Sequence, residues 1–225
     1  MAPRSQLYGR TFVCGPRGSR QIALTFDDGP NDPHTLRLLE VLARHEVKAT
    51  FFMIGRFVVQ RPDIVRQVAS AGHVIGNHTF NHPNLIFCSP ARVRDELEQC
   101  RKALSDVIGE HSNLFRFPYG GRLPHVLRMA RELNLESVMW SVSSKDWRLT
   151  TADAIEQQVA CNIRGGDVVL MHDGFPQRMG ADRSKSVEAA DKIIRRYKGE
   201  GFAFVTVPEL ARTVARLQPP ARSVS

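Results

Sequence analysis

The 225-residue sequence lacks any run of about 18 consecutive apolar residues, so it predicts no helix that crosses a membrane. Its first residues contain no apolar stretch as long as a signal peptide, and we expect a cytoplasmic protein unless a leader precedes this sequence. The four cysteines form no C-x-x-C pair, which argues against a cysteine-rich zinc ribbon or a thioredoxin-like redox site. We expect unpaired and mostly buried thiols.

The chain also lacks internal repeats and low-complexity linkers, and its length suits one domain. The net charge is +8, but no dense basic run alternates with aromatic residues, so we do not expect nucleic acid as a partner. A solvated basic surface and an acidic polymer as partner both fit this charge. We predict an N-terminal extension (1–19), one domain (20–217) and a flexible polar tail (218–225). The oligomeric state does not follow from the sequence.

Short β-rich runs alternate with helical patterns along the chain. Strands are predicted at residues 21–26, 49–54, 74–77, 114–117, 137–142, 167–171 and 202–205. The first helix is expected to have Asp32 as its N-cap and Pro33 as its first residue, and the last to begin with a capping box of Thr206 and Glu209. Strands separated by helices imply a parallel sheet with right-handed crossovers, either a barrel or a doubly wound sheet.

Residue types that carry chemistry stand at the carboxyl ends of these strands. They are Asp27, Asp28, His78, His82, Arg116, Tyr119, Asp146, Trp147 and His172. In a barrel all carboxyl ends of the strands meet on one face, whereas the outer strands of an open sheet lie too far apart to share a site. The positions therefore favour an α/β fold in which about seven parallel strands form a distorted (β/α) barrel.

Two histidines four residues apart, His78 and His82, would face the same way on a helical turn and could share a metal ion. The pattern alone is weak, and Asp28 is the best third ligand. Two imidazoles and one carboxylate leave coordination positions open, as a catalytic zinc site requires. Asp27 and Asp28 by themselves could form an ordinary acidic turn. The turn at residues 29–30 could instead let one carboxylate reach the metal while the other faces its bound water.

Two further residues are ambiguous when taken alone. Arg116 beside a carboxylate would hold its orientation, but it could also be a surface arginine. His172 follows an apolar run, where a lone histidine is commonly a hydrogen-bonded core residue.

Five segments occur together in one order: TFDDGP (25–30), HTFNH (78–82), RFPY (116–119), DW (146–147) and LMH (170–172). Together they resemble the polysaccharide deacetylase superfamily, the NodB homology domain of carbohydrate esterase family four. The resemblance extends from residue 21 to about residue 212. It implies a distorted barrel of about seven strands and a hydrolase that removes N-acetyl groups from N-acetylglucosamine-containing glycans, chitin-like or peptidoglycan.

The resemblance also implies roles on the metal side of the site. Asp28, His78 and His82 would hold one divalent ion, usually zinc and sometimes cobalt. Asp27 would be the general base, and Arg116 would tether it.

On the other side, the resemblance makes His172 the general acid and gives the backbone N–H of Tyr119 to the oxyanion hole. Tyr119, Pro118 and Trp147 would contact the sugar. The fourth motif of the family usually opens with an aspartate that pairs with the catalytic histidine, and Ser143 stands there. We therefore expect His172 to be a weaker base than is usual in the family. On the basic limb of the pH–rate profile, activity should then decline at a lower pH.

Several alternatives fit parts of the pattern. They are an O-acetyl esterase on xylan-type glycan, a hydrolase of a small cyclic amide, a non-catalytic sugar-binding barrel (favoured only by Ser143), and a non-haem iron oxygenase with the same ligand types. The βα alternation and the aspartate-first order argue against the oxygenase. Arg178, Arg183 and Lys185, in the loop after His172, either attract an anionic glycan such as peptidoglycan or are simply solvated.

Overall fold

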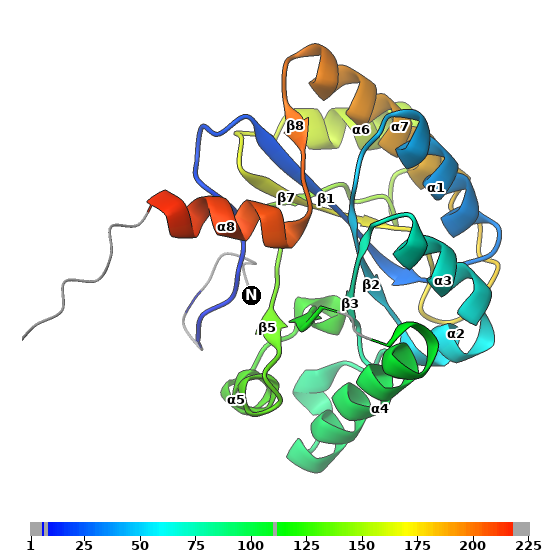
Figure 1. Ribbon diagram of the computed structural model, residues 1–225, viewed down its shortest axis with the longest axis vertical. Helices are drawn as coiled ribbons and strands as arrows, with labels where there is room; N and C mark the ends of the chain where they lie inside the picture. The colour runs from blue at the N-terminus through cyan, green and yellow to red at the C-terminus, as the bar shows by residue number, and fades with distance from the viewer. Residues whose placement is uncertain (1–5, 7–8, 110–111, 218–225) are drawn as a thin grey trace, which may run out of the picture.

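The computed structural model describes residues 6, 9–109 and 112–217 (Figure 1). Its strands are β1 (Gln21–Gly29), β2 (Thr50–Met53), β3 (Val74–Asn77), β4 (Leu114–Phe115), β5 (Glu136–Ser137), β6 (Val142–Ser143), β7 (Asp167–His172) and β8 (Ala203–Phe204). Its helices are α1 (His34–Arg44), α2 (Gly55–Gln60), α3 (Pro62–Ser70), α4 (Pro90–Ile108), α5 (Pro124–Glu132), α6 (Ala152–Ala160), α7 (Ser184–Gly199) and α8 (Val207–Leu217), with 3-10 helices η1 (Leu85–Phe87) and η2 (Pro118–Gly120).

All these strands form one sheet in the order β5-β4-β3-β2-β1-β7-β6, and β8 pairs with the first residues of β1. Every pairing between named strands is parallel. The sheet curls, so that helices such as α1, α3 and α7 lie on its outer side (Figure 1). The predicted single-domain barrel of parallel strands is confirmed in preference to a doubly wound sheet.

The strand predicted at residues 137–142 is divided in the structure into β5 and β6. The N–H of Val138 donates to the carbonyl oxygen of Phe115 on β4 at 2.8 Å, whereas the N–H of Ser141 donates to that of Val168 on β7 at 3.0 Å. The chain thus leaves one edge of the sheet and joins the other. Because this segment changes partners, the described residues form eight strands, in agreement with the prediction of about seven.

Side chains of β1 alternate between the two faces of the sheet. Ile22, Leu24 and Phe26 join the large core beneath the outer helices. Ala23 belongs to a smaller cluster inside the barrel, and Asp27 lies on the same face because alternate residues of a strand point the same way. The strand pattern therefore directs Asp27 into the barrel, near its carboxyl end.

Helix α8 closes the opposite end of the barrel. Its Val207 and Leu210 join the inner cluster, and the N–H of Val207 donates to Thr50 Oγ1 at the start of β2 (3.1 Å). Half of the predicted capping box is present: the Glu209 carboxylate accepts the backbone N–H (2.7 Å) and the hydroxyl (2.8 Å) of Thr206. With this end filled, the carboxyl ends of the strands remain as the place for a pocket.

The predicted cap of the first helix is wrong. Helix α1 begins at His34, Pro33 occupies the N-cap position, and no side chain caps the helix. The Asp32 carboxylate instead pairs with Arg61, which leaves it unavailable to the helix terminus.

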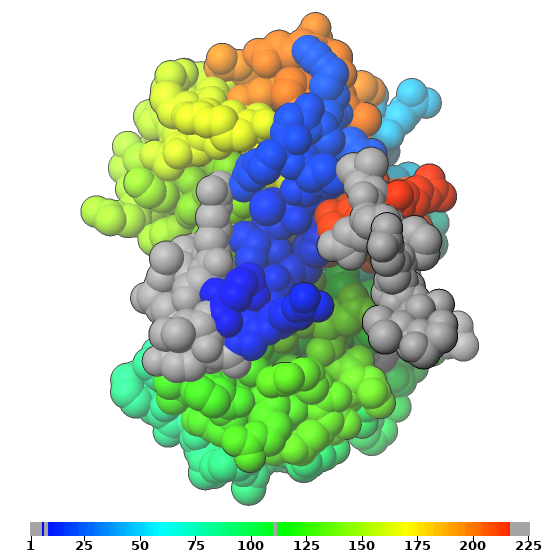
Figure 2. All heavy atoms as spheres, turned by 90° about the vertical axis from the view of Figure 1, so that its left-hand side faces the viewer, coloured from blue at the N-terminus to red at the C-terminus, as the bar shows by residue number. Residues whose placement is uncertain are grey.

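The described part of the predicted N-terminal extension, residue 6 and residues 9–19, packs against the domain. Phe12 forms a parallel bridge with Val138, and Cys14 forms an antiparallel bridge with Asp167. Figure 2 shows this segment (blue) lying across one face of the molecule between segments that are far apart in the sequence. The predicted domain boundaries stay a prediction, and the predicted flexible tail lies outside the described residues.

All four cysteines are free, as predicted, but only Cys100 is buried. Within the described residues, no helix is both long and apolar enough to span a membrane.

Candidate active site

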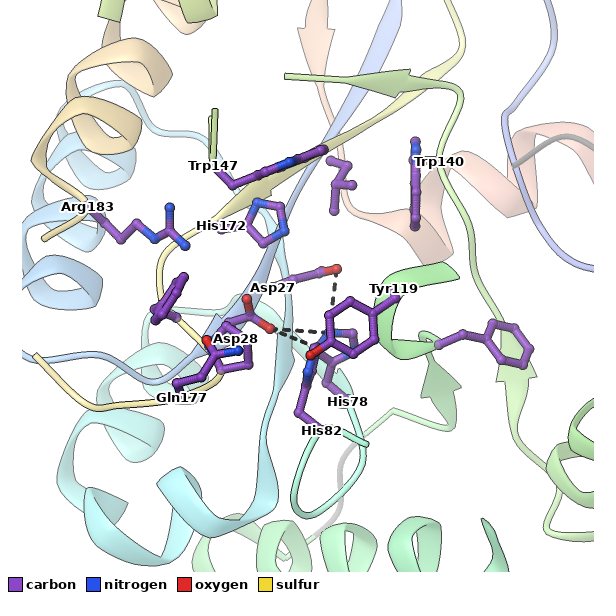
Figure 3. Close-up of a pocket in the computed structure, with 14 residues that line it drawn as sticks. Asp27, Asp28, His78, His82, Tyr119, Trp140, Trp147, His172, Gln177 and Arg183 are labelled. Atoms are coloured by element: carbon purple, nitrogen blue, oxygen red, sulfur yellow. Dashed lines mark ion pairs between the residues drawn. The ribbon is translucent and has the colours of Figure 1, made fainter. Parts of the chain in front are cut away.

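The first two candidate residues lie where β1 becomes irregular. The pairing of β1 with β2 shifts register between Asp27 and Gly29, and Asp28 has a positive φ of 74°. Adjacent side chains of a regular strand point to opposite faces, but a bulge re-aims them. Both carboxylates consequently line the same pocket (Figure 3). The sequence assigned this change to the turn at residues 29–30, whereas the structure has it at Asp28 itself.

His78 and His82 lie in a loop after β3, so the predicted helical turn is wrong. The loop folds back because Thr79 and His82 adopt positive φ values of 65° and 61°, and the two rings lie 4.8 Å apart between centroids. Asn77 Oδ1 accepts the N–H of Thr79 at 2.8 Å, and Thr79 Oγ1 accepts the N–H of His82 at 3.0 Å. Such backbone conformations persist only where surrounding contacts hold them.

The carboxylate of Glu96, on α4, holds the same loop from outside. Glu96 is 1% exposed, and its Oε2 accepts the N–H groups of Phe80 (3.0 Å) and Asn81 (2.7 Å). Arg92 pairs with Glu96 at 2.5 Å and balances the buried charge. The sequence did not mark Glu96, because a glutamate within a long helix is ordinary until the packing of that helix is known.

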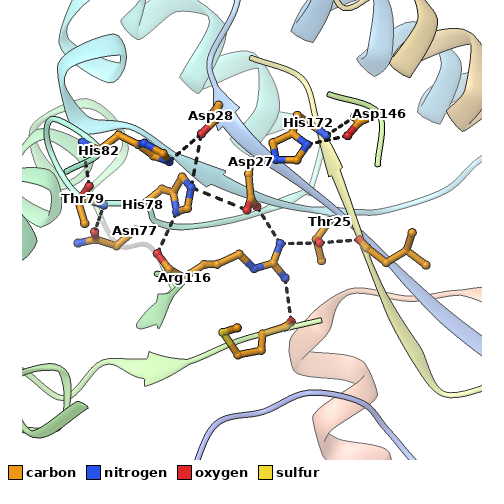
Figure 4. A network of polar contacts seen from close by, with 12 residues as sticks. Thr25, Asp27, Asp28, Asn77, His78, Thr79, His82, Arg116, Asp146 and His172 are labelled. Atoms are coloured by element: carbon orange, nitrogen blue, oxygen red, sulfur yellow. Dashed lines mark hydrogen bonds and ion pairs between the residues drawn. The ribbon is translucent and has the colours of Figure 1, made fainter. Parts of the chain in front are cut away.

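The donor atoms of Asp28, His78 and His82 converge within 4.8 Å of one another (Figure 4). Asp28 Oδ1 lies 3.5 Å from His78 Nε2 and 3.2 Å from His82 Nε2. His78 Nδ1 lies 2.9 Å from the carbonyl oxygen of Arg116, which can only accept, so Nδ1 carries the proton and Nε2 offers a lone pair. Burial, with His78 nearby, lowers the pKa of His82 to about 3 and keeps its imidazole neutral.

This donor set fits a divalent ion. Among the described residues, the buried Asp28 Oδ1 has no hydrogen-bond donor, an arrangement that is costly unless a cation or a proton lies between it and the ring nitrogens. Burial opposes ionisation of Asp28, but the imidazoles, His78 foremost, outweigh it and lower the pKa of Asp28 to about 2. A carboxylate and two neutral imidazoles are a ligand set of catalytic zinc sites.

Arg116 is fully buried inside the barrel and fixes the orientation of Asp27. Its Nη1 donates to Asp27 Oδ1 (2.8 Å) and Thr25 Oγ1 (2.7 Å), and its Nη2 donates to the carbonyl oxygen of Met139 (3.1 Å). The other carboxylate oxygen, Asp27 Oδ2, lies 3.8 Å from His78 Nε2. The predicted contact between Arg116 and Asp27 is therefore present, and one oxygen of Asp27 is left to face the metal cluster (Figure 4).

His172 ends β7 and is paired with Asp146. Its Nδ1 lies 2.7 Å from Asp146 Oδ1, while its own N–H (2.8 Å) and the Ser186 hydroxyl (2.9 Å) donate to Asp146 Oδ2. Burial of the ring opposes its charged form, but the Asp146 carboxylate outweighs burial and raises the pKa of His172 to about 9. The ring is thus suited to carry a proton into the pocket.

This pair corrects the expectation for Ser143. Strand β6 ends at Ser143, whose Oγ is buried without a hydrogen-bond partner among the described residues. The following turn presents Asp146 to His172, so the imidazolium does have a carboxylate partner. The premise that His172 lacks a carboxylate partner does not hold, and the lower position of its basic limb stays a prediction.

A pocket of about 360 Å³ opens over these groups. Tyr119 and Trp147 lie at its edge, 62% and 48% exposed, and their rings contact His82 and His172 edge-on, at centroid distances of 4.7 and 5.2 Å. Pro118 is buried in η2 and is not among the described residues that line the pocket, so its contact with sugar stays a prediction. It begins the short helix in which Tyr119 has a positive φ of 57°.

The loop between β7 and α7, residues 173–183, forms the wall of the pocket away from Tyr119 (Figure 3). Its anchor is the amide of Asn31, which is 1% exposed. Nδ2 donates to the carbonyl oxygens of Asp173 and Ala181 at 2.9 Å each, and Oδ1 accepts the N–H of Gly180 at 2.7 Å. The sequence did not mark Asn31 either, because asparagine after a glycine-proline turn is commonplace.

The barrel and its pocket define a class of protein: a parallel α/β barrel with a two-histidine, one-carboxylate cluster, flanked by a tethered carboxylate and a histidine–aspartate pair. A profile of the polysaccharide deacetylase family matches residues 15–138, more than half of the chain. The chain belongs to this family.

Relatives named by their activity agree with this assignment. The chain is 40% identical over 199 residues to a peptidoglycan-N-acetylglucosamine deacetylase of Bacillus cereus, covering 88% of this chain and 71% of that protein. It is 38% identical over 203 residues to a chitooligosaccharide deacetylase of Bradyrhizobium sp., covering 86% and 91%. The crystal structure of the Bc1960 peptidoglycan N-acetylglucosamine deacetylase has a TM-score of 0.83 at 38% identity, covering 89% and 92%. The family resemblance inferred from the five motifs is confirmed.

Proposed function

We propose that this protein is a metal-dependent hydrolase that removes the N-acetyl group from N-acetylglucosamine residues of a polysaccharide or oligosaccharide. The observation that carries the proposal is the order of groups across one pocket: a tethered carboxylate, a three-residue metal cluster and a histidine–aspartate pair. The named activities of the relatives, on peptidoglycan and on chitooligosaccharides, support the same class of substrate.

Zinc is the ion that we propose, with cobalt able to replace it, held by Asp28, His78 and His82. When bound, such an ion would polarise the acetyl carbonyl and lower the pKa of a coordinated water. Two imidazoles and an ionised carboxylate match the ligand preference of zinc.

Asp27 is proposed to take the proton from the attacking water. Because Arg116 holds Oδ1 at 2.8 Å, the carboxylate cannot rotate away, and Oδ2 stays on the side of His78. A positioned general base typically contributes roughly 10²–10⁴-fold to the rate.

His172 is proposed to protonate the departing amine nitrogen, a step that amide cleavage requires. Asp146 fixes the tautomer by accepting from Nδ1 and stabilises the charged ring, so the proton to be donated is on Nε2. Tyr119 is proposed to give its backbone N–H to the oxyanion. The rings of Tyr119 and Trp147 are proposed to bracket the sugar.

The test is acetate release from an N-acetylglucosamine pentamer by protein stripped with chelator and then re-supplied with zinc. We expect release to return with zinc and to be lost in Asp27→Asn and His78→Ala, but not in His125→Ala, a histidine of α5 outside the cluster. Release from acetylxylan alone would instead support the O-acetyl esterase. Zinc binding without release from the pentamer, acetylxylan or peptidoglycan would support the sugar-binding barrel, although the Asp146–His172 pair removes the sequence feature that favoured it.

A further inference from the structure

Three cations follow His172 closely in the sequence, and the structure separates them. Arg178 and Lys185 are exposed, whereas Arg183 is only 8% exposed and lines the catalytic pocket. The interpretation of all three as one solvated basic loop is therefore wrong for Arg183.

The guanidinium of Arg183 is held in place from two sides. Its Nε donates to the carbonyl oxygen of Gly174 at 2.6 Å, and its Cζ lies 5.4 Å from the ring centroid of Phe175. The loop that carries Phe175 is itself anchored by Asn31. The group is thus preorganised, which lowers the entropic cost of binding a ligand.

The two terminal nitrogens of Arg183 have no bonding partner among the described residues. Within the described part of the chain they form no hydrogen bond and no ion pair, and they point into the pocket near Trp147 and His172 (Figure 3). The Asp146 carboxylate, which accepts from His172 and Ser186, forms no ion pair with them in the described part of the chain. These nitrogens are not among the buried side-chain atoms that lack a partner, so they are accessible from the pocket and can donate to a ligand there.

We propose that Arg183 binds a carboxylate of the glycan, so that the pocket prefers N-acetylglucosamine residues that neighbour an acidic sugar. This inference rests on the proposed deacetylase function and names the class of its substrate. The planar fork of a guanidinium matches the two oxygens of a carboxylate and binds both at once, whereas a sugar hydroxyl can occupy only one of its donors.

The experiment compares two oligosaccharides of alternating N-acetylglucosamine and N-acetylmuramic acid that differ in one group. One carries free lactyl carboxyl groups, and in the other these groups are amidated and uncharged. The wild-type enzyme loaded with zinc is expected to favour the acidic form in kcat/KM by roughly tenfold or more, the ratio that one charge-assisted contact supplies. The preference should reside in KM and weaken as salt is added.

In Arg183→Gln the ratio of kcat/KM for the acidic over the amidated form should fall to about one, so that the acidic substrate loses more than the amidated form and a neutral chitin tetramer do. Arg183→Lys should keep part of the preference, because it retains the charge but not the fork. Arg178→Gln, a cation of the same loop that is exposed, should keep all of it.

An equal loss on all three substrates in Arg183→Gln would overturn the proposal and make Arg183 a structural support of the loop. No preference in the wild-type enzyme would overturn it as well. If no glycan releases acetate, the proposed function fails, and the Arg183 site is then judged by calorimetric binding of the acidic and amidated oligosaccharides. Equal affinities there would reject the site, and tighter binding of the acidic form that is lost in Arg183→Gln would support it.

Discussion

Two loops frame the pocket, and one buried polar side chain from a neighbouring element anchors each of them. The metal-side loop, residues 78–82, turns backbone N–H groups toward its anchor, and that anchor is the Glu96 carboxylate. The glycan-side loop, residues 173–183, turns mainly carbonyl oxygens toward its anchor, the Asn31 amide. The comparison teaches that the unpaired backbone groups of a loop dictate the chemistry of its anchor, because buried N–H and C=O groups must be satisfied.

The two loops also differ in exposure. His78, Thr79 and His82 of the metal-side loop are buried, whereas Phe175 and Gln177 of the glycan-side loop are exposed. We infer that the first loop serves the chemistry and the second serves substrate binding. Changes on the metal side should therefore affect ion affinity and kcat, and changes on the glycan side should affect KM.

The largest effect is expected from His82→Ala, which removes one of three proposed ligands. The ion contributes several kcal/mol of transition-state stabilisation, so acetate release should fall at least about 10³-fold. Zinc affinity, measured by competition with a chelator, should fall with it. His125→Ala is the matched control, and full activity of His82→Ala would remove the metal-side loop from the chemistry.

The next effect is expected from Asp146→Asn, in the turn after β6, whose partner His172 directly precedes the glycan-side loop. The Asp146 carboxylate, working against burial, raises the pKa of His172 from 6.5 to about 9. Without it the basic limb of the pH–rate profile should move down by at least about one unit, and the rate should fall about 10²-fold or more. Ser143→Asp should leave the limb in place, because Asp146 already fills the role.

The same pair predicts a pH dependence of stability. The folded-state pKa of His172 lies above its unfolded value, so the pair stabilises the fold fully below pH 6.5 and progressively less as pH rises through about 9. Thermal unfolding across this range should show a decline that Asp146→Asn reduces. An identical pH dependence in the variant would mean that the pair does not govern the titration.

The sequence predicted the catalytic groups better than the features that hold them. Asp28, His78 and Arg116 stand at strand ends in a parallel barrel, and strand ends can be located from hydrophobic pattern alone. Glu96 and Asn31 could not be found this way, because each bonds to backbone that is distant in sequence and adjacent only after packing.

Two local errors have physical reasons as well. The spacing of His78 and His82 suits a helical turn, but positive φ angles at Thr79 and His82 achieve the same convergence in a loop. The partner of His172 depends on where β6 ends, which a two-residue strand with little propensity signal does not reveal. The position of Ser143 in the motif therefore gave the wrong partner for His172, and Asp146 is the residue that pairs with it.

A smaller effect is expected from Glu96→Gln, which keeps the shape of the metal-side anchor. Both oxygens of the Glu96 carboxylate accept hydrogen bonds from the loop, whereas a glutamine amide offers only one acceptor oxygen. The loop should therefore be held less firmly. Zinc affinity should fall by roughly 10–100-fold, as for other residues that orient metal ligands, with KM little changed. Glu98→Gln, exposed on the same helix, is the control. A change in KM alone would contradict the division of labour between the two loops.

The smallest effect on chemistry is expected from Asn31→Ala on the glycan side. The change leaves the carbonyl oxygens of Asp173 and Ala181 without a donor, which should lower the free energy of unfolding by about 1–3 kcal/mol. The loop should lose its fixed position against the pocket, and KM for a chitin tetramer should rise roughly tenfold, the equivalent of about 1.4 kcal/mol of lost binding.

Zinc affinity and kcat should change little, since no bond of the Asn31 side chain reaches the metal cluster within the described residues. Asn162→Ala, which removes an exposed amide in the turn after α6, controls for loss of an asparagine. If zinc affinity falls instead while KM is unchanged, the two loops are coupled through β1, and the separation between chemistry and binding does not hold.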